Sequence, residues 1–135
     1  MNLVVLGINH KTASVDLREK VAFSVEQLEF ALKQMLNSSE FLETVIVSTC
    51  NRTEIYCSLE SDNSQILLAW LADFHHLTET ELSQHTYCYT NEKAVSHLMC
   101  VACGLDSLVL GEPQILGQIK QAYQNAKNQS CVGVL

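Results

Sequence analysis

The chain has 135 residues, of which 47% are hydrophobic and 17% are charged, and its formal net charge is −7. These values are typical of one soluble globular domain, and we expect neither a membrane span nor a signal peptide, because no apolar run is long enough and no basic segment opens the chain. The negative charge argues against broad nucleic-acid binding, which depends on neutralising phosphates.

The six cysteines are spaced irregularly, and the chain is not a small secreted scaffold. This pattern favours free thiols in a reducing cytoplasm over a disulfide framework. We expect the cysteines other than Cys50 to be buried as small apolar residues.

The first third of the chain predicts a strand and two helices. Residues 3–8 form an apolar run that is typical of a strand. Ser14 is placed to cap a short helix. Ser24 with Gln27 forms a capping box for a second helix, which we expect to end at residues 37–39.

The middle of the chain predicts two strands, two helices and a third strand. Residues 45–47 are typical of a buried strand, and residues 53–59 alternate apolar with polar side chains. Residues 67–74 follow a helical pattern, and Thr78 is placed to start another short helix. Residues 87–89 predict a brief strand.

The last third is expected to be mostly helical. Thr90 is placed to cap a helix that runs to Cys103, and residues 105–110 form a loop between two glycines. Pro113 suits the first turn of a final helix that ends near Asn128. The order β-α-β-β-α-β predicts an α+β fold of the ferredoxin-like split βαβ type with additional C-terminal helices, in one domain over residues 1–135.

The segment at residues 48–56 is the first candidate for chemistry. Cys50 lies at the end of an apolar strand, where a thiol can reach a cleft, and Arg52 follows two residues later. A guanidinium there can hold a carboxylate and favour a thiolate. Thr49 and Asn51 bring small polar groups suited to bind a carbonyl. The alternative is that Cys50 is a structural residue.

A second candidate segment spans residues 106–118, where polar side chains stand among apolar neighbours. They are Ser107, Glu112, Gln114 and Gln118. Gln114 and Gln118 are four residues apart and share a helix face. The alternative is ordinary helix capping by Glu112 with solvated glutamines.

His97 is a third candidate, although a lone helical histidine is commonly structural. His97, Cys100 and Cys103 recur at a spacing of three residues, which favours a rival interpretation as a metal or redox site. No fourth ligand stands at a convincing spacing, so we expect no metal. The five glycines form no dinucleotide or Walker motif, so we expect no cofactor site in this chain.

Several segments together resemble the glutamyl-tRNA reductase family over the whole chain: residues 7–13, 15–19, 48–54 and 110–118. The resemblance implies an N-terminal catalytic domain that binds glutamyl-tRNA(Glu). The family reduces this substrate with NADPH to glutamate-1-semialdehyde, the first step of five-carbon tetrapyrrole (porphyrin and haem) biosynthesis. Its NADPH-binding and dimerisation domains have no counterpart in this chain.

The resemblance also implies roles for individual residues. Cys50 would be the nucleophile that forms a thioester, and His97 would be a second catalytic residue. The residues expected to bind substrate are Thr49, Asn51, Arg52, Ser107, Glu112, Pro113, Gln114 and Gln118.

Further expectations concern partners. NADPH is expected to bind to a domain missing here, so this chain alone should not complete the reduction. The full-length enzyme is expected to be a cytoplasmic homodimer through a missing domain, and this chain a monomer that does not bind membranes. The runner-up hypothesis is a non-catalytic ferredoxin-like binding or regulatory module in which Cys50 is structural.

Overall fold

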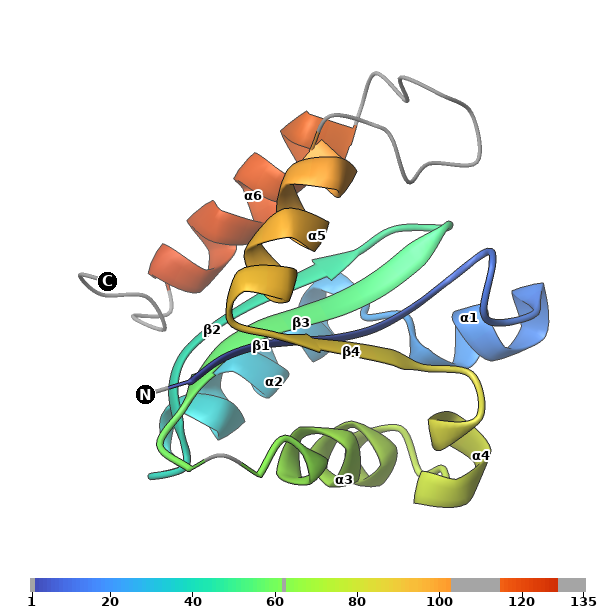
Figure 1. Cartoon of the computed structure of the whole chain (residues 1–135), viewed down its shortest axis with the longest axis horizontal. Coiled ribbons are helices and arrows are strands. Elements are labelled where there is room, and N and C mark those ends of the chain that lie inside the picture. The colour runs from blue at the N-terminus through green and yellow to red at the C-terminus, as the bar shows by residue number, and fades with distance from the viewer. Residues whose placement is uncertain (1, 62, 103–114, 129–135) are drawn as a thin grey trace.

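The computed structural model describes residues 2–61, 63–102 and 115–128 of the chain (Figure 1). Its described strands form one four-stranded sheet in the order β2-β3-β1-β4. They are β1 (Asn2–Asn9), β2 (Phe41–Ser48), β3 (Arg52–Leu59) and β4 (Tyr87–Thr90). Neighbouring strands are antiparallel, so β1 and β2 run parallel to each other on either side of β3.

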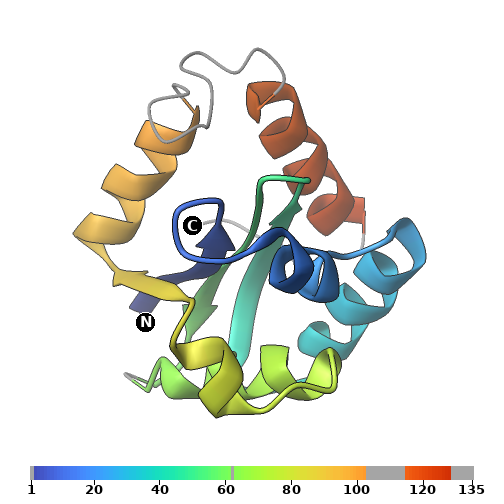
Figure 2. The ribbon, with the colours of Figure 1, turned by 90° about the vertical axis from the view of Figure 1, so that its right-hand side faces the viewer.

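Helices cover both faces of this sheet (Figures 1 and 2). Helices α5 (Glu92–Ala102) and α6 (Ile115–Asn128) lie on one face. The opposite face carries α2 (Val25–Leu36) and α3 (Gln65–Phe74), with α1 (Val15–Val21) and α4 (Glu79–Ser83) beside them. The fold is therefore a mixed α/β arrangement of helices around an antiparallel sheet. No helix in the described part of the chain combines the length and apolar character needed to cross a membrane.

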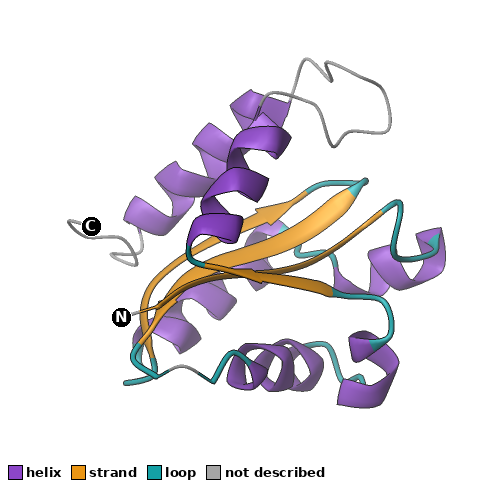
Figure 3. Cartoon of the chain, in the orientation of Figure 1, coloured by secondary structure: helices purple, strands orange, loops and turns teal. Residues whose placement is uncertain are grey.

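The sheet separates a larger core from a smaller one. In β1, Val4, Leu6 and Ile8 face the larger core under α2 and α3, whereas Val5 faces the smaller core under α5 and α6. Every residue of β3 is buried, because helices lie on both sides of this inner strand (Figure 3). The predicted alternation along β3 therefore marks two buried faces, one apolar and one largely polar.

The predicted helix starts are confirmed where a serine or threonine cap is present. The Ser14 side chain accepts a hydrogen bond from the Leu17 amide at 3.3 Å. Ser24 and Gln27 form both bonds of the capping box that starts α2. Thr78 accepts from the third residue of α4 in the same way. Strand β2 is longer than the predicted residues 45–47, because its pairing with β3 begins at Phe41.

The predicted cap of α5 by Thr90 is wrong. Thr90 is the last residue of β4 and pairs with Val4. The chain turns at Asn91, which adopts a positive φ of 51° that asparagine tolerates better than most residues. The Asn91 amide donates to the Leu3 carbonyl at 2.7 Å, and its Oδ1 accepts from the Leu3 amide at 3.1 Å. The predictions for Cys103, the loop at 105–110 and Pro113 lie outside the described residues.

Candidate active site

Cys50 lies at the tip of the β2–β3 hairpin, at the end of the sheet where β1 also ends (Figure 1). Thr49 holds the turn: its amide donates to the Arg52 carbonyl at 2.8 Å, and its Oγ1 accepts from the amides of Asn51 and Arg52 at 3.1 and 3.2 Å. Arg18 donates to the Cys50 carbonyl at 3.4 Å. The thiol of Cys50 is exposed and not in a disulfide. A tightly bonded turn therefore presents this thiol to solvent.

The expectation that the other cysteines are buried is only partly met. Cys57 is buried, and burial together with the neighbouring Cys88 raises the pKa of its thiol to about 12. Cys88 and Cys100 are exposed, so for them the expectation is wrong. Cys88 lies on the edge strand β4 and Cys100 near the end of α5, where less of the protein covers them. A chemical reaction with the exposed thiols must therefore distinguish Cys50 from Cys88 and Cys100.

Arg52 starts β3, and the residue is only 1% exposed. Alternate residues of a strand share a face, so Arg52, Glu54 and Tyr56 all point to the side covered by α5 and α6. The Arg52 Nη1 lies 3.6 Å from the Glu54 Oε2. The guanidinium thus lies beneath the hairpin in a buried ion pair, and its expected contact with a substrate carboxylate stays a prediction.

Glu54 is the centre of a buried polar cluster, which we call the Glu54 cluster: Arg52, Glu54, Tyr56, Tyr87 and His97. The Glu54 Oε1 accepts a bond from the Tyr56 hydroxyl at 3.0 Å. Its Oε2 accepts from the Tyr87 hydroxyl at 2.5 Å and also contacts the His97 Nε2. Strands β3 and β4 and helix α5 supply these five side chains.

The Glu54 carboxyl is ionised at neutral pH despite its burial. Burial raises its pKa, but the hydrogen bonds from His97 and Tyr87 and the charges of His97 and Arg52 outweigh this effect, so the pKa lies below its ordinary value. For Tyr87, burial and the Glu54 charge raise the pKa of the phenol. Tyr87 is therefore a protonated donor to a carboxylate.

His97 projects from α5 against two tyrosine rings, which also contact each other at a centroid distance of 5.6 Å. Its ring centroid is 5.0 Å from those of both Tyr87 and Tyr89. The side chain is 11% exposed and borders a shallow hollow of about 300 Å³ that Tyr89, Lys93 and Cys100 also line. None of the described contacts of His97 reaches Cys50. The structure thus ties His97 to Glu54 and links it to the hairpin only indirectly.

Of the second predicted segment, only Gln118 falls within the described side chains. Gln118 is half-buried and lines a cavity of about 200 Å³ with Phe23 and Ser48, next to the hairpin that carries Cys50. Its Oε1 has no hydrogen-bond partner among the described residues. The remaining predicted substrate residues lie outside the described residues: Ser107, Glu112, Pro113 and Gln114.

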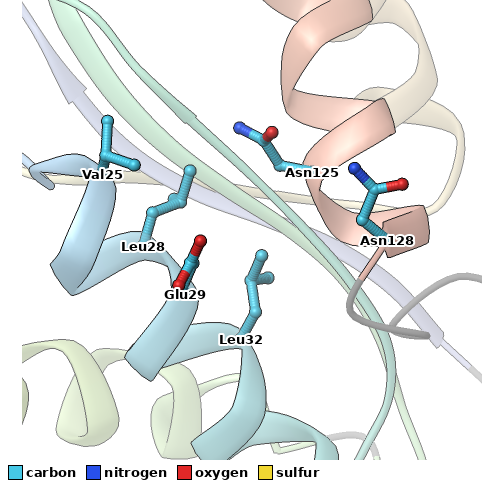
Figure 4. Close-up of a pocket in the computed structure, with 6 residues that line it drawn as sticks. All are labelled: Val25, Leu28, Glu29, Leu32, Asn125 and Asn128. Atoms are coloured by element: carbon cyan, nitrogen blue, oxygen red, sulfur yellow. The ribbon is translucent and has the colours of Figure 1, made fainter.

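This cavity continues between α2 and α6 as a groove, which Figure 4 shows at its far end. Leu28 and Leu32 of α2 form one wall, and Asn125 and Asn128 of α6 form the other. The α2 wall is therefore largely apolar but also carries Glu29, and the α6 wall presents side-chain amides. Gln118 lines the end of this groove that is nearer to Cys50.

Sequence reasoning missed Glu54, Tyr56 and Tyr87 as members of the site. One weak signal was available: Glu54 is a charged residue in a strand that also carries Ile55, Cys57 and Leu59. A second signal is Gly7, which pairs with both Glu54 and Tyr87 in the sheet. A Cβ atom at Gly7 would lie 2.8 Å from the Glu54 Cγ and 2.8 Å from the Tyr87 Oη. The Gly7 signal needs the strand register before it can be used.

The rival metal interpretation gains no support from the described residues, among which no three His, Cys, Asp or Glu side chains are grouped as ligands. Cys103, which that interpretation requires, lies outside them.

Comparisons with known proteins agree on one family. A family model described as glutamyl-tRNAGlu reductase, N-terminal domain, matches residues 6–135. The glutamyl-tRNA reductase of Pseudoalteromonas translucida is 65% identical over 99% of this chain and 32% of its own length. That of Idiomarina loihiensis is 61% identical over 98% of this chain and 31% of its own length.

A solved structure gives the same answer. The glutamyl-tRNA reductase from Methanopyrus kandleri superimposes with a TM-score of 0.79 at 31% identity, over 97% of this chain and 29% of that one. The chain spans about a third of the length of the curated relatives that it matches. From the match of the family model over nearly all its residues, the chain belongs to the family of glutamyl-tRNA reductase N-terminal domains.

Proposed function

We propose that this chain is the catalytic domain of a glutamyl-tRNA reductase and that Cys50 is its nucleophile. The observation that carries the proposal is the exposed thiol on a turn fixed by Thr49, in a chain of this family. That exposure also argues against the runner-up hypothesis, in which Cys50 is structural.

In the proposed step, the Cys50 thiolate attacks the ester carbonyl that joins glutamate to the tRNA 3′ end. A carbon–sulfur bond forms, the carbon–oxygen bond to the ribose breaks, and the ribose oxygen leaves as a hydroxyl after taking a proton. The product is a glutamyl thioester, which is more readily reduced than an ester. His97 is proposed either to supply that proton or to orient the substrate.

The remaining predicted residues form the glutamyl pocket in this proposal. Arg52 is assigned to the side-chain carboxylate, because its planar fork matches that shape. Gln118 fits a substrate contact, since its Oε1 is a buried acceptor beside the hairpin. The other proposed contacts are Thr49, Asn51, Ser107, Glu112, Pro113 and Gln114.

The reductant is proposed to bind elsewhere. NADPH would supply a hydride to the thioester, but the sequence has no dinucleotide motif, and Gly7 lies inside β1 and not in a phosphate loop. In this proposal the residues of this chain do not carry out the reductive step. The homodimer through another domain and the monomeric state of this chain are likewise proposals.

Two further proposals concern location and topology. A cytoplasmic protein is consistent with the described cysteines Cys50, Cys57, Cys88 and Cys100, which form no disulfide. The split βαβ, ferredoxin-like description is supported by the strand order, in which β3 lies between the parallel strands β1 and β2.

The proposed nucleophile can be tested by mass spectrometry of the chain after it is mixed with glutamyl-tRNA. We expect a mass gain of one glutamyl group on Cys50 and none in Cys50→Ser. Cys88→Ser and Cys100→Ser are the matched controls, because both remove another exposed thiol, and both should retain the adduct. An absent adduct on the unmodified chain, or an equal one on Cys50→Ser, would overturn the proposal.

A further inference from the structure

We propose that Glu54 and Tyr87 are positioning residues of this site: Glu54 holds the His97 imidazole through its Nε2, and Tyr87 holds Glu54. This inference rests on the proposed function for its catalytic consequence, but its structural part can be tested separately.

Four groups meet at the Glu54 carboxylate. Oε2 of Glu54 is shared by the Tyr87 hydroxyl, the His97 Nε2 and the Arg52 guanidinium, and Oε1 accepts from Tyr56. The Glu54 side chain is fully buried. A buried charge is tolerated only when its partners are well placed, so the loss of one partner should disturb the others.

Contacts run without a break from the Cys50 turn to His97. The backbone of Arg52 closes the turn through Thr49, and the Arg52 side chain meets Glu54. Glu54 then contacts the His97 Nε2. Glu54 therefore sets the position of His97 relative to the same hairpin that carries Cys50.

The two ring nitrogens of His97 have different surroundings. Because the Glu54 carboxylate can only accept, the Nε2 of His97 must carry the proton that it shares with Glu54. No hydrogen bond to Nδ1 occurs among the described residues. The neutral ring thus carries a lone pair on Nδ1 and the charged ring an Nδ1–H, and the His97 side chain borders the adjacent hollow.

Gly7 leaves space for the Glu54 cluster. Any side chain there would press on both Glu54 and Tyr87, with close approaches of 2.8 Å, and also on the Thr53 carbonyl at 2.9 Å. The backbone of β1 therefore accommodates the cluster. Glycine in a strand interior commonly marks such a close approach.

Tyr87→Phe and Tyr89→Phe form a matched pair for the test. The centroids of both rings lie 5.0 Å from that of His97, but of these two tyrosines only Tyr87 donates a hydrogen bond to Glu54. In the 135-residue chain with ¹⁵N-labelled histidine, we expect a slowly exchanging Nε2–H proton for His97, assigned by its loss in His97→Asn. Tyr87→Phe should speed its exchange with water, and Tyr89→Phe should not. Equal exchange in all three proteins would overturn the inference.

The catalytic consequence is measured as the rate of glutamyl transfer to Cys50. Tyr87→Phe should lower the rate at saturating glutamyl-tRNA about 5-fold, the effect of one ordinary hydrogen bond, with little change in the half-saturating concentration. Tyr89→Phe should stay close to the unmodified chain. In a His97→Asn background, Tyr87→Phe should have no further effect, because it acts through His97.

If Tyr87→Phe lowered the transfer rate equally with and without His97, the role of Tyr87 would be purely structural, and the inference would be contradicted. If the unmodified chain forms no adduct, the proposed function fails, whereas the exchange measurement still decides whether Tyr87 and Glu54 position His97. Glu54→Gln should lower the transfer rate more than Tyr87→Phe does. If the Glu54→Gln protein does not fold, the Tyr87→Phe variant still tests the inference.

Discussion

At Gly7, the main chain of β1 passes close to the side chains that build the Glu54 cluster. The residue pairs with Glu54 on one side and Tyr87 on the other. Its role is to leave room, since any Cβ atom would meet the Glu54 Cγ, the Tyr87 Oη and the Thr53 carbonyl at 2.8 to 2.9 Å. The carbonyl belongs to the sheet backbone and cannot move aside.

Gly7→Ala is therefore expected to destabilise the chain by about 1 to 3 kcal/mol, the usual cost of overpacking. In an uncrowded strand, the same change would stabilise the protein by roughly 0.4 to 1 kcal/mol, because alanine reduces the conformational entropy of the unfolded chain. The sign of the change in stability therefore shows whether Gly7 is crowded. Urea unfolding measures the difference. Tyr87→Phe removes one of the crowded atoms. The double variant should therefore lose less unfolding free energy than the two single variants lose together. An unchanged or higher stability of Gly7→Ala would contradict the packing argument.

Helix α3 ends in a C-terminal cap in which histidine occupies a position that usually holds glycine. The Leu77 amide donates to the Ala72 carbonyl at 2.9 Å, and the His76 amide donates to the Asp73 carbonyl at 3.2 Å. This pair of bonds is the Schellman motif, which normally places glycine at the left-handed position. Here His76 occupies it, with a φ of 57°.

His76→Gly is expected to stabilise the chain by about 0.5 to 1 kcal/mol, because glycine adopts a positive φ without steric cost. Thermal or urea unfolding measures the gain. The control is His76→Ala, which removes the same exposed side chain but retains a Cβ, and which should not stabilise. If the two variants behaved alike, the gain would come from loss of the imidazole and not from the backbone.

Local features of the helices could be predicted from the sequence, whereas contacts between distant elements could not. The capping box of Ser24 and Gln27 joins residues three apart, so both of its halves are visible in the sequence. The start of α5 instead depends on Asn91 pairing with Leu3, across 88 residues of chain. The Thr90 prediction failed because this cross-strand bond, and not the local capping preference, decides where β4 ends.

The same distinction applies to the candidate site. The Cys50 turn was visible because Thr49, Cys50 and Arg52 are neighbours in sequence. The Glu54 cluster joins Glu54 to His97 over 43 residues and to Tyr87 over 33. It required the order β3-β1-β4 and the placement of α5 over that face, neither of which a spacing of residues reveals.

For the whole molecule, charge limits how the chain can meet a nucleic acid. The net charge is −7, with only eight Lys and Arg residues. Arg18 lies at the Cys50 turn, and Lys11 and Lys20 are exposed close to it in sequence. Arg52 is engaged with Glu54 beneath the hairpin. At this end of the sheet, the described residues therefore offer about three cations for phosphates.

We therefore expect this chain to bind glutamyl-tRNA mainly through its aminoacylated end, with a shallow salt dependence. Three phosphate contacts to a single strand predict a slope of about −2 in a plot of log affinity against log salt concentration. Titrations with Cys50→Ser, which avoid transfer, would measure it. Arg18→Gln should make the slope shallower by about 0.7, whereas Lys127→Gln, in the last turn of α6, should leave it unchanged. A slope steeper than about −4 would require a basic surface that the described residues do not provide, and it would contradict binding through the aminoacylated end alone.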